Sequence, residues 1–96
     1  MLISKGASVG EVVTFKLVTG EELIGKLGEE TATYFLIERP LALVMSQKGL
    51  GLQPWLFTVN PDKHIKFPKD KVIVLEATME EMSKNYLSGT SGIALA

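Results

Sequence analysis

Apolar and polar residues alternate with a period of two along most of this chain. In residues 12–18, for example, Val13, Phe15 and Leu17 alternate with polar residues. Such alternation is typical of a β-strand with one buried face. The same criterion predicts further short strands, at residues 22–28, 33–38, 41–46, 55–60, 64–67 and 71–75. The pattern therefore predicts a mainly β fold.

Glycines and prolines separate and bend these strands. Residues 19–21 predict a tight turn between the first two strands. Gly25 and Gly28 lie within the second strand, where glycine marks sharp bending or close approach of another backbone. Pro40 predicts an edge or a bulge, and residues 47–54 predict a flexible loop with unusual leucines. Short strands with glycine bends curl into a small, partly open barrel rather than a flat sheet.

One segment, residues 79–88, has the signals of a helix. Thr78 precedes it and Glu81 follows three positions later, which matches a capping box. The apolar residues of this segment recur at the spacing of one helix face: Met79, Met82 and Tyr86. Gly89 predicts the end of the helix. Residues 89–96 predict a flexible tail of small residues.

The composition indicates one small folded domain. The 96 residues fit a single domain spanning 1–96, in which the barrel covers residues 12–76. Hydrophobic residues make up 46% of the chain and charged residues 22%, which excludes intrinsic disorder. A domain of this size leaves much of its surface exposed, so part of this apolar inventory is expected to lie outside the core.

The absence of cysteine and of long apolar runs indicates a soluble, cytoplasmic protein. With no cysteine, a disulfide framework, a thiolate zinc site and a cysteine nucleophile are excluded. The longest apolar runs, at residues 41–45 and 72–75, are far shorter than the roughly 18 residues that span a bilayer. The net charge of −1 gives no overall attraction to nucleic acid or membrane, so any basic surface is local.

No arrangement of residues predicts an enzyme, a metal site or a cofactor. His64 is the sole histidine. The acidic pairs at residues 21–22 and 29–30 flank one strand, where neighbouring side chains point to opposite faces, so neither pair forms an acid–base dyad. They are interpreted as solvated turn charges. Residues 49–51 lack the lysine and the helix that a phosphate-binding glycine loop requires.

Residues 63–71 form the most basic segment, with four lysines against one aspartate. The lysines are Lys63, Lys66, Lys69 and Lys71. A basic hairpin that includes an aromatic such as Phe67 can follow a phosphate backbone and stack on a base. Alternatively, lysines flank a turn because turns are solvated, and lysines at strand edges discourage aggregation. Trp55 and Phe57 are equally open to two interpretations, a stacking platform or the barrel core.

Two stretches of the chain together have a recognisable layout. In residues 13–38 an apolar strand, a turn with Gly20 and a bent strand with Gly25 precede the aromatic and apolar run at 34–38. Residues 67–75 then combine a basic turn with a short apolar strand. This order resembles the two sequence signatures of Sm-like proteins, and the resemblance covers most of residues 12–76.

The resemblance implies a fold and an assembly. The fold would be a small, SH3-like, strongly bent open barrel of five strands, here with a C-terminal helix. Sm-like subunits assemble head to tail into closed rings, of roughly five to seven copies, that bind single-stranded RNA. An open barrel leaves unpaired strand edges, which provides an independent physical reason for such assembly. Divergent members occur in archaea, bacteria and phages.

The resemblance also implies site residues. The basic and aromatic residues expected to bind RNA are Lys69, Lys66, Lys71, His64, Tyr34 and Phe35. Lys69 would be the main phosphate contact at the inner rim of the ring, and one of the two aromatics would stack on a base. The ring interface is expected on the last apolar strand, at Val72, Ile73, Val74 and Leu75.

Three features depart from the family pattern. Thr31 and Phe35 occupy the positions where RNA-binding members carry an acidic residue and an asparagine, and Asp70 replaces the glycine of the second signature. The N-terminal helix of the family has no counterpart. These departures favour an alternative, a homo-oligomeric assembly or adaptor module that has lost the RNA pocket. Such a module would act through the apolar loop at residues 50–52 and the C-terminal helix.

Overall fold

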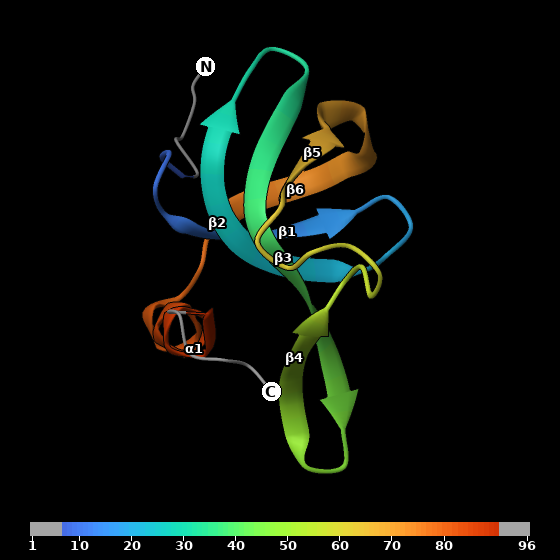
Figure 1. The fold of residues 1–96 in the computed structure, drawn as a ribbon, viewed down its shortest axis with the longest axis vertical. Helices are drawn as coiled ribbons and strands as arrows, with labels where there is room; N and C mark the ends of the chain where they lie inside the picture. The colour runs from blue at the N-terminus through green and yellow to red at the C-terminus, as the bar shows by residue number, and fades with distance from the viewer. Residues whose placement is uncertain (1–6, 91–96) are drawn as a thin grey trace.

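The computed structural model describes residues 7–90, which form one antiparallel sheet and one helix (Figure 1). The elements in chain order are β1 (Val12–Leu17), β2 (Glu22–Glu30), β3 (Tyr34–Ser46), β4 (Gly49–Pro54), β5 (His64–Pro68), a 3₁₀ helix (Lys69–Lys71), β6 (Val72–Ala77) and α1 (Glu80–Thr90). The predicted mainly β fold with a C-terminal helix is therefore confirmed. The sheet has six strands, whereas the resemblance implies five.

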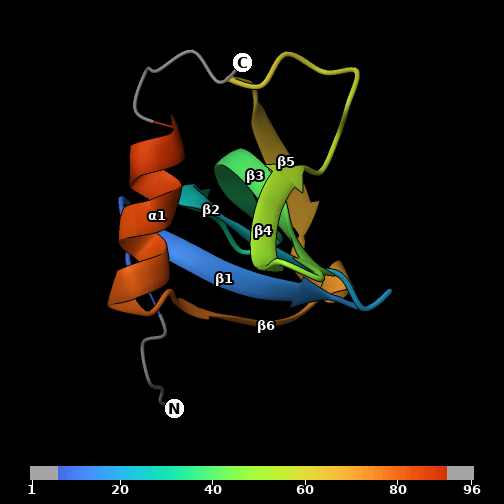
Figure 2. The same ribbon diagram turned by 90° about the horizontal axis from the view of Figure 1, so that it is seen from below.

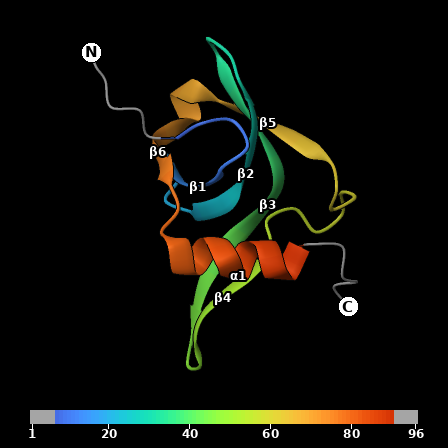
Figure 3. The ribbon, with the colours of Figure 1, turned by 90° about the vertical axis from the view of Figure 1, so that its left-hand side faces the viewer.

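The long strand β3 organises the sheet. The strand order is β4-β3-β2-β1-β6, and β5 also pairs with β3. The C-terminal half of β3 pairs with β4, as Leu43 does with Leu52, whereas its N-terminal half pairs with β5, as Leu36 does with Lys66. The two short strands therefore lie along the same edge of β3. The sheet curls without closing, because β5 and β6 are not paired with each other (Figure 3).

This shared edge explains two errors of the sequence prediction. Residues 49–54 form β4 instead of a loop, since Leu50 and Leu52 lie opposite apolar partners of β3. Residues 55–60 form no strand, because the chain leaves the sheet between β4 and β5. Trp55 still turns inward, with its ring centroid 5.0 Å from that of Phe67, but Phe57 is 74% exposed and is not part of the core.

Strand β3 bends sharply at its centre. Arg39 adopts a left-handed backbone conformation (φ 50°), and the pairing with β2 shifts register between Ile24 and Lys26. The bulge predicted from Pro40 is confirmed, although the strand continues through it. Beyond the bend, β3 and β4 extend away from the curled sheet as a hairpin (Figure 1).

The apolar core has two parts. One lies inside the curled sheet, where Phe15 and Phe67 meet edge to face with centroids 4.9 Å apart. The other lies under α1, where Tyr86 packs on Val12 and Ile24. Figures 2 and 3 show α1 beside the curled sheet and next to the β3–β4 hairpin. The Tyr86 hydroxyl donates hydrogen bonds to the carbonyl oxygens of Glu38 (2.8 Å) and Arg39 (3.0 Å).

The predicted apolar face of the helix is only partly buried. Tyr86 is buried and Met82 half-buried, but Met79 is 67% exposed. Met79 precedes α1, which begins at Glu80 rather than at residue 79; the predicted end at Gly89 is also wrong, since the helix continues through Gly89 to Thr90. The hydroxyl of Thr78 forms a hydrogen bond with the hydroxyl of Thr14 (2.8 Å), which ties the start of the helix to β1.

Gly25 is required because the backbone of β2 lies very close to β3 at this position. A Cβ atom at this position would overlap the side chain of Ile37 and lie 3.1 Å from the carbonyl oxygen of Glu38. We expect Gly25→Ala to lower the free energy of unfolding by about 1–3 kcal/mol, the usual cost of overpacking. Gly51→Ala is the control, since its Cβ would make an ordinary contact with Val44. Urea unfolding measures both; equal midpoints for the two variants would contradict the close approach.

Candidate nucleic-acid interface

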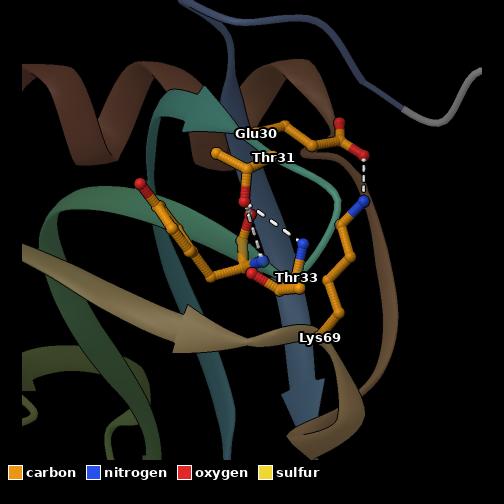
Figure 4. A network of polar contacts seen from close by, with 5 residues as sticks. Glu30, Thr31, Thr33 and Lys69 are labelled. Carbon is orange, nitrogen blue, oxygen red and sulfur yellow. Dashed lines mark hydrogen bonds and ion pairs between the residues drawn. The ribbon is translucent and has the colours of Figure 1, made fainter.

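The turn between β2 and β3 is locked by its own hydrogen bonds. The hydroxyl oxygen of Thr31 accepts hydrogen bonds from the backbone N–H groups of Thr33 (3.2 Å) and Tyr34 (3.1 Å). The Thr31 N–H donates to the carbonyl oxygen of Tyr34 (2.9 Å). Such side-chain-to-backbone bonds hold a turn in one conformation. Figure 4 shows this network at the end of the sheet.

The start of the 3₁₀ helix lies against this turn. The backbone N–H of Lys69 donates to the carbonyl oxygen of Thr33 (2.8 Å). The pairing of β3 with β5, in which Tyr34 lies opposite Pro68, brings the two segments together. In Figure 4 the side chains of Lys69 and Glu30 point toward each other across the turn. Their Nζ and Oε2 atoms are 2.7 Å apart and form an ion pair.

Two lysines lie over two aromatic rings at this end of the sheet. Lys66 Nζ is 5.0 Å from the ring centroid of Tyr34, and Lys69 Nζ is 5.0 Å from that of Phe35. Both distances are within the range of cation–π attraction. We call these four residues, Tyr34, Phe35, Lys66 and Lys69, the basic–aromatic cluster. The structure thus forms two lysine–aromatic pairs, at the same end of the sheet, from four of the six residues expected to bind RNA.

The two aromatic rings of the cluster have different surroundings. Neighbouring residues of a strand point to opposite faces. Phe35 accordingly packs against the core inside the curled sheet. Tyr34 lies on the other face, half-buried beneath Lys66. Tyr34 is therefore the better candidate for stacking on a base, while Phe35 supports Lys69.

Of the other two expected contacts, His64 lies apart from the cluster, whereas Lys71 follows Lys69 by two residues in the same 3₁₀ helix. His64 pairs with Glu38 at the opposite end of β5, about 13 Å along the strand from Pro68. Lys71 ends the 3₁₀ helix, and its carbonyl oxygen accepts a hydrogen bond from the N–H of Val18 (2.9 Å). Both side chains are exposed.

Glu30 is the residue of this site that the sequence did not identify. The pair Glu29-Glu30 was interpreted as solvated turn charge, yet Glu30 contacts Lys69, 39 positions further along the chain. Only the register of β2 and β3, which sets Glu30 opposite Phe35, would have identified this contact. That register depends on the length of the β2–β3 turn, and local alternation does not reveal it.

The expected interface strand has one buried and one exposed set of side chains. Val72 and Leu75 pack against the core. Ile73 and Val74 are 62% and 46% exposed. Among residues 7–90, β6 pairs only with β1 and β5 only with β3, so each strand has one unpaired edge.

A cavity of about 640 Å³ lies beside α1, at some distance from the cluster. It lies between the end of β4, the bend of β3, the 55–63 segment and the second half of the helix, and Leu41, Leu56, Val59 and Tyr86 are among the residues that line it. Glu38, Arg39 and His64 line a second, smaller cavity nearby. Because both acidic and basic side chains line the second cavity, the electrostatic environment of His64 differs from that of the cluster.

Within residues 7–90 the basic–aromatic cluster is the most distinctive polar arrangement. No group of three metal-ligating side chains comes together in this part of the chain. None of its helices has the length and apolar character needed to cross a bilayer. No protein-family model and no curated protein matches the chain.

Proposed function

We propose that this chain is a subunit of an Sm-like ring that binds single-stranded RNA without catalysis. The observation that supports RNA binding is the basic–aromatic cluster, in which two ammonium groups lie 5.0 Å from two ring centroids at one end of the sheet. Single-stranded nucleic acids present bases for stacking and phosphates for ion pairing at the same time. A surface that combines both features suits this class of ligand.

Each residue of the cluster has a distinct role in this proposal. Tyr34 stacks on a base, and the ammonium of Lys66 contacts the adjacent phosphate. Lys69 contacts a second phosphate, and Phe35 holds its ammonium from the core side. Lys71 and His64 contribute only long-range attraction, because they lie outside the cluster.

The ring is supported by the exposed part of β6. Ile73 and Val74 are large apolar side chains on a strand with a free edge. An uncovered apolar edge strand is a template for pairing with another chain. The free edge of β5 offers the complementary surface, so repeated head-to-tail pairing would close a ring. In this arrangement the exposed apolar side chains of β6 would be buried between subunits.

We expect Lys66→Ala to weaken RNA binding about tenfold, the effect of losing one charge-assisted contact, and Lys69→Ala to weaken it less, because Lys69 is already paired with Glu30. Lys66→Ala should also reduce the slope of log K against log salt by about 0.7, the value for one phosphate on a single strand, and Lys69→Ala by a smaller amount. Fluorescence anisotropy with labelled oligo(U) and oligo(A) at low salt measures both quantities. Lys48→Ala is the control, because Lys48 is an exposed lysine at the tip of the β3–β4 hairpin.

Wild-type binding no tighter than about 10⁻⁴ M, the non-specific range, would overturn the RNA proposal. A uniform loss in all three lysine variants would also contradict it. In that case the electrostatic attraction would come from the net charge and not from the cluster.

The alternative is an assembly or adaptor module that keeps the ring without binding RNA. Two observations favour it. Lys69 is already paired with Glu30, and the β3–β4 hairpin exposes Met45 (76%) and Leu50 (56%) at its tip. An assembled ring that binds neither oligonucleotide, and on which Lys69→Ala has no effect, would support this alternative.

A further inference from the structure

Lys69 is held in place from three directions. Its ammonium is 2.7 Å from a carboxylate oxygen of Glu30 and 5.0 Å from the ring centroid of Phe35. Its backbone N–H donates to the carbonyl oxygen of Thr33. The ammonium that faces a phosphate in the proposed function therefore already has an anionic partner within the same chain.

The backbone around Glu30 is fixed by hydrogen bonds. It is the last residue of β2, and it lies opposite Phe35 in the ladder with β3. The adjacent turn is fixed by the Thr31 hydroxyl, which bonds the N–H groups of Thr33 and Tyr34. The position of the carboxylate thus follows from the β2–β3 ladder and the locked turn, in addition to its attraction to Lys69.

The ion pair is nevertheless accessible. The side chains of Lys69 and Glu30 are 33% and 43% exposed. Exposed pairs of this kind contribute little to folding stability, so either partner can be replaced without unfolding the chain. An incoming phosphate either displaces the Glu30 carboxylate or binds beside it and is repelled by its charge. Both routes reduce the net gain from the contact with Lys69.

We infer that Glu30 is an internal competitor of the RNA phosphate for Lys69, and that it sets the affinity and the salt dependence of the RNA site. This inference rests on the proposed function. Without Glu30, Lys69 presents its full charge to RNA. With Glu30, the site retains only part of that attraction, and base stacking on Tyr34 becomes a larger share of binding. The site therefore favours strands that offer a stackable base over polyanions that offer only phosphate.

The test compares Glu30→Gln with Glu29→Gln. Both substitutions remove one negative charge at the end of β2, but Glu29 is exposed and forms no ion pair with a lysine among residues 7–90. We expect Glu30→Gln to raise the affinity for labelled oligo(U) about three- to tenfold, and to steepen the salt slope by less than about 0.7, since Lys69 already supplies part of one phosphate contact. Glu29→Gln should change the affinity less than about twofold, an effect of screened charge alone. Inorganic polyphosphate, which has no bases, should gain more than oligo(U) from Glu30→Gln.

The double variant Lys69→Ala with Glu30→Gln completes the comparison. The gain in RNA affinity that Glu30→Gln gives should vanish when Lys69 is absent. Thermal unfolding of each variant verifies that it remains folded. Equal affinities for Glu30→Gln and Glu29→Gln, or weaker binding by Glu30→Gln, would overturn this inference while the proposed function stands. Absence of RNA binding in the wild type and in every variant would overturn the proposed function, and this inference with it.

Discussion

Replacing both Ile73 and Val74 with aspartate is expected to convert the proposed ring into monomers. The wild type should sediment at several times 10.5 kDa, and the double variant at the mass of one chain. The reason is that both side chains are exposed on β6 in the isolated subunit but would be buried between subunits in the proposed ring. Burying an unpaired carboxylate costs several kcal/mol. That cost is a large part of the about 8 kcal/mol that a micromolar interface supplies.

The matched control is Val9→Asp. Val9 is 60% exposed, which is close to the value for Ile73, but it lies outside the strands of the sheet. Because all these positions are exposed, none of the substitutions should unfold the subunit, and circular dichroism verifies this. Analytical ultracentrifugation or native mass spectrometry reports the mass. A monomeric wild type at micromolar concentration would contradict the ring, and an assembled double variant would place the interface elsewhere.

Truncation of Tyr86 is expected to have the largest effect on stability. Its side chain is only 2% exposed, and it joins α1 to Val12 and Ile24. We expect Tyr86→Ala to lower the free energy of unfolding by about 3–5 kcal/mol, the usual cost of removing a buried aromatic ring. Small domains have only about 5–15 kcal/mol in total. Urea unfolding at one fixed protein concentration measures the loss, since the proposed assembly would make stability concentration-dependent.

Tyr86→Phe separates the hydroxyl from the ring. It leaves the carbonyl oxygens of Glu38 and Arg39 without this donor, so we expect a smaller loss of about 1–3 kcal/mol. Leu87→Ala is the control on the same helix, because Leu87 is 45% exposed and should lose little. Similar losses for Tyr86→Ala and Leu87→Ala would show that α1 is not anchored through Tyr86.

The pH dependence of stability provides a second measurement on the same residue. Burial raises the pKa of Tyr86 to about 12, whereas a tyrosine in an unfolded chain titrates near about 10. The hydroxyl therefore stabilises the fold fully below about pH 10, and this contribution is lost as the pH rises toward 12. Tyr86→Phe should lack this alkaline loss. If the stability of the wild type and of Tyr86→Phe fell equally at alkaline pH, other titrating groups would be the cause.

The local pattern of the sequence was sufficient for most of the secondary structure. Alternation in residues 12–18 and 22–28 predicted β1 and β2, although each strand also buries a residue on its other face, Val12 and Ile24, under α1. Gly25 predicted a close backbone approach, which the contact with Glu38 confirms. Tyr86 was expected on the buried face of the helix, and it is among the largest fully buried side chains.

The local pattern failed where pairing partners decide the structure. The glycines of residues 49–54 suggested a loop, but β3 is long enough to pair with this segment. Residues 55–60 alternate like a strand, but β4 and β5 already occupy the available edge of β3. A strand forms where a neighbour supplies its hydrogen bonds, and the sequence of one segment does not contain that information.

Sequence patterns alone were enough to predict a mainly β chain with a C-terminal helix and to propose six RNA contacts, Tyr34, Phe35, His64, Lys66, Lys69 and Lys71. It took the tertiary structure to show that four of them form two lysine–aromatic pairs, and that Glu30 pairs with Lys69. The physical reason is the difference in range between the two kinds of information. Side-chain periodicity acts over a few residues, whereas strand order and register are fixed by packing between segments far apart in the chain.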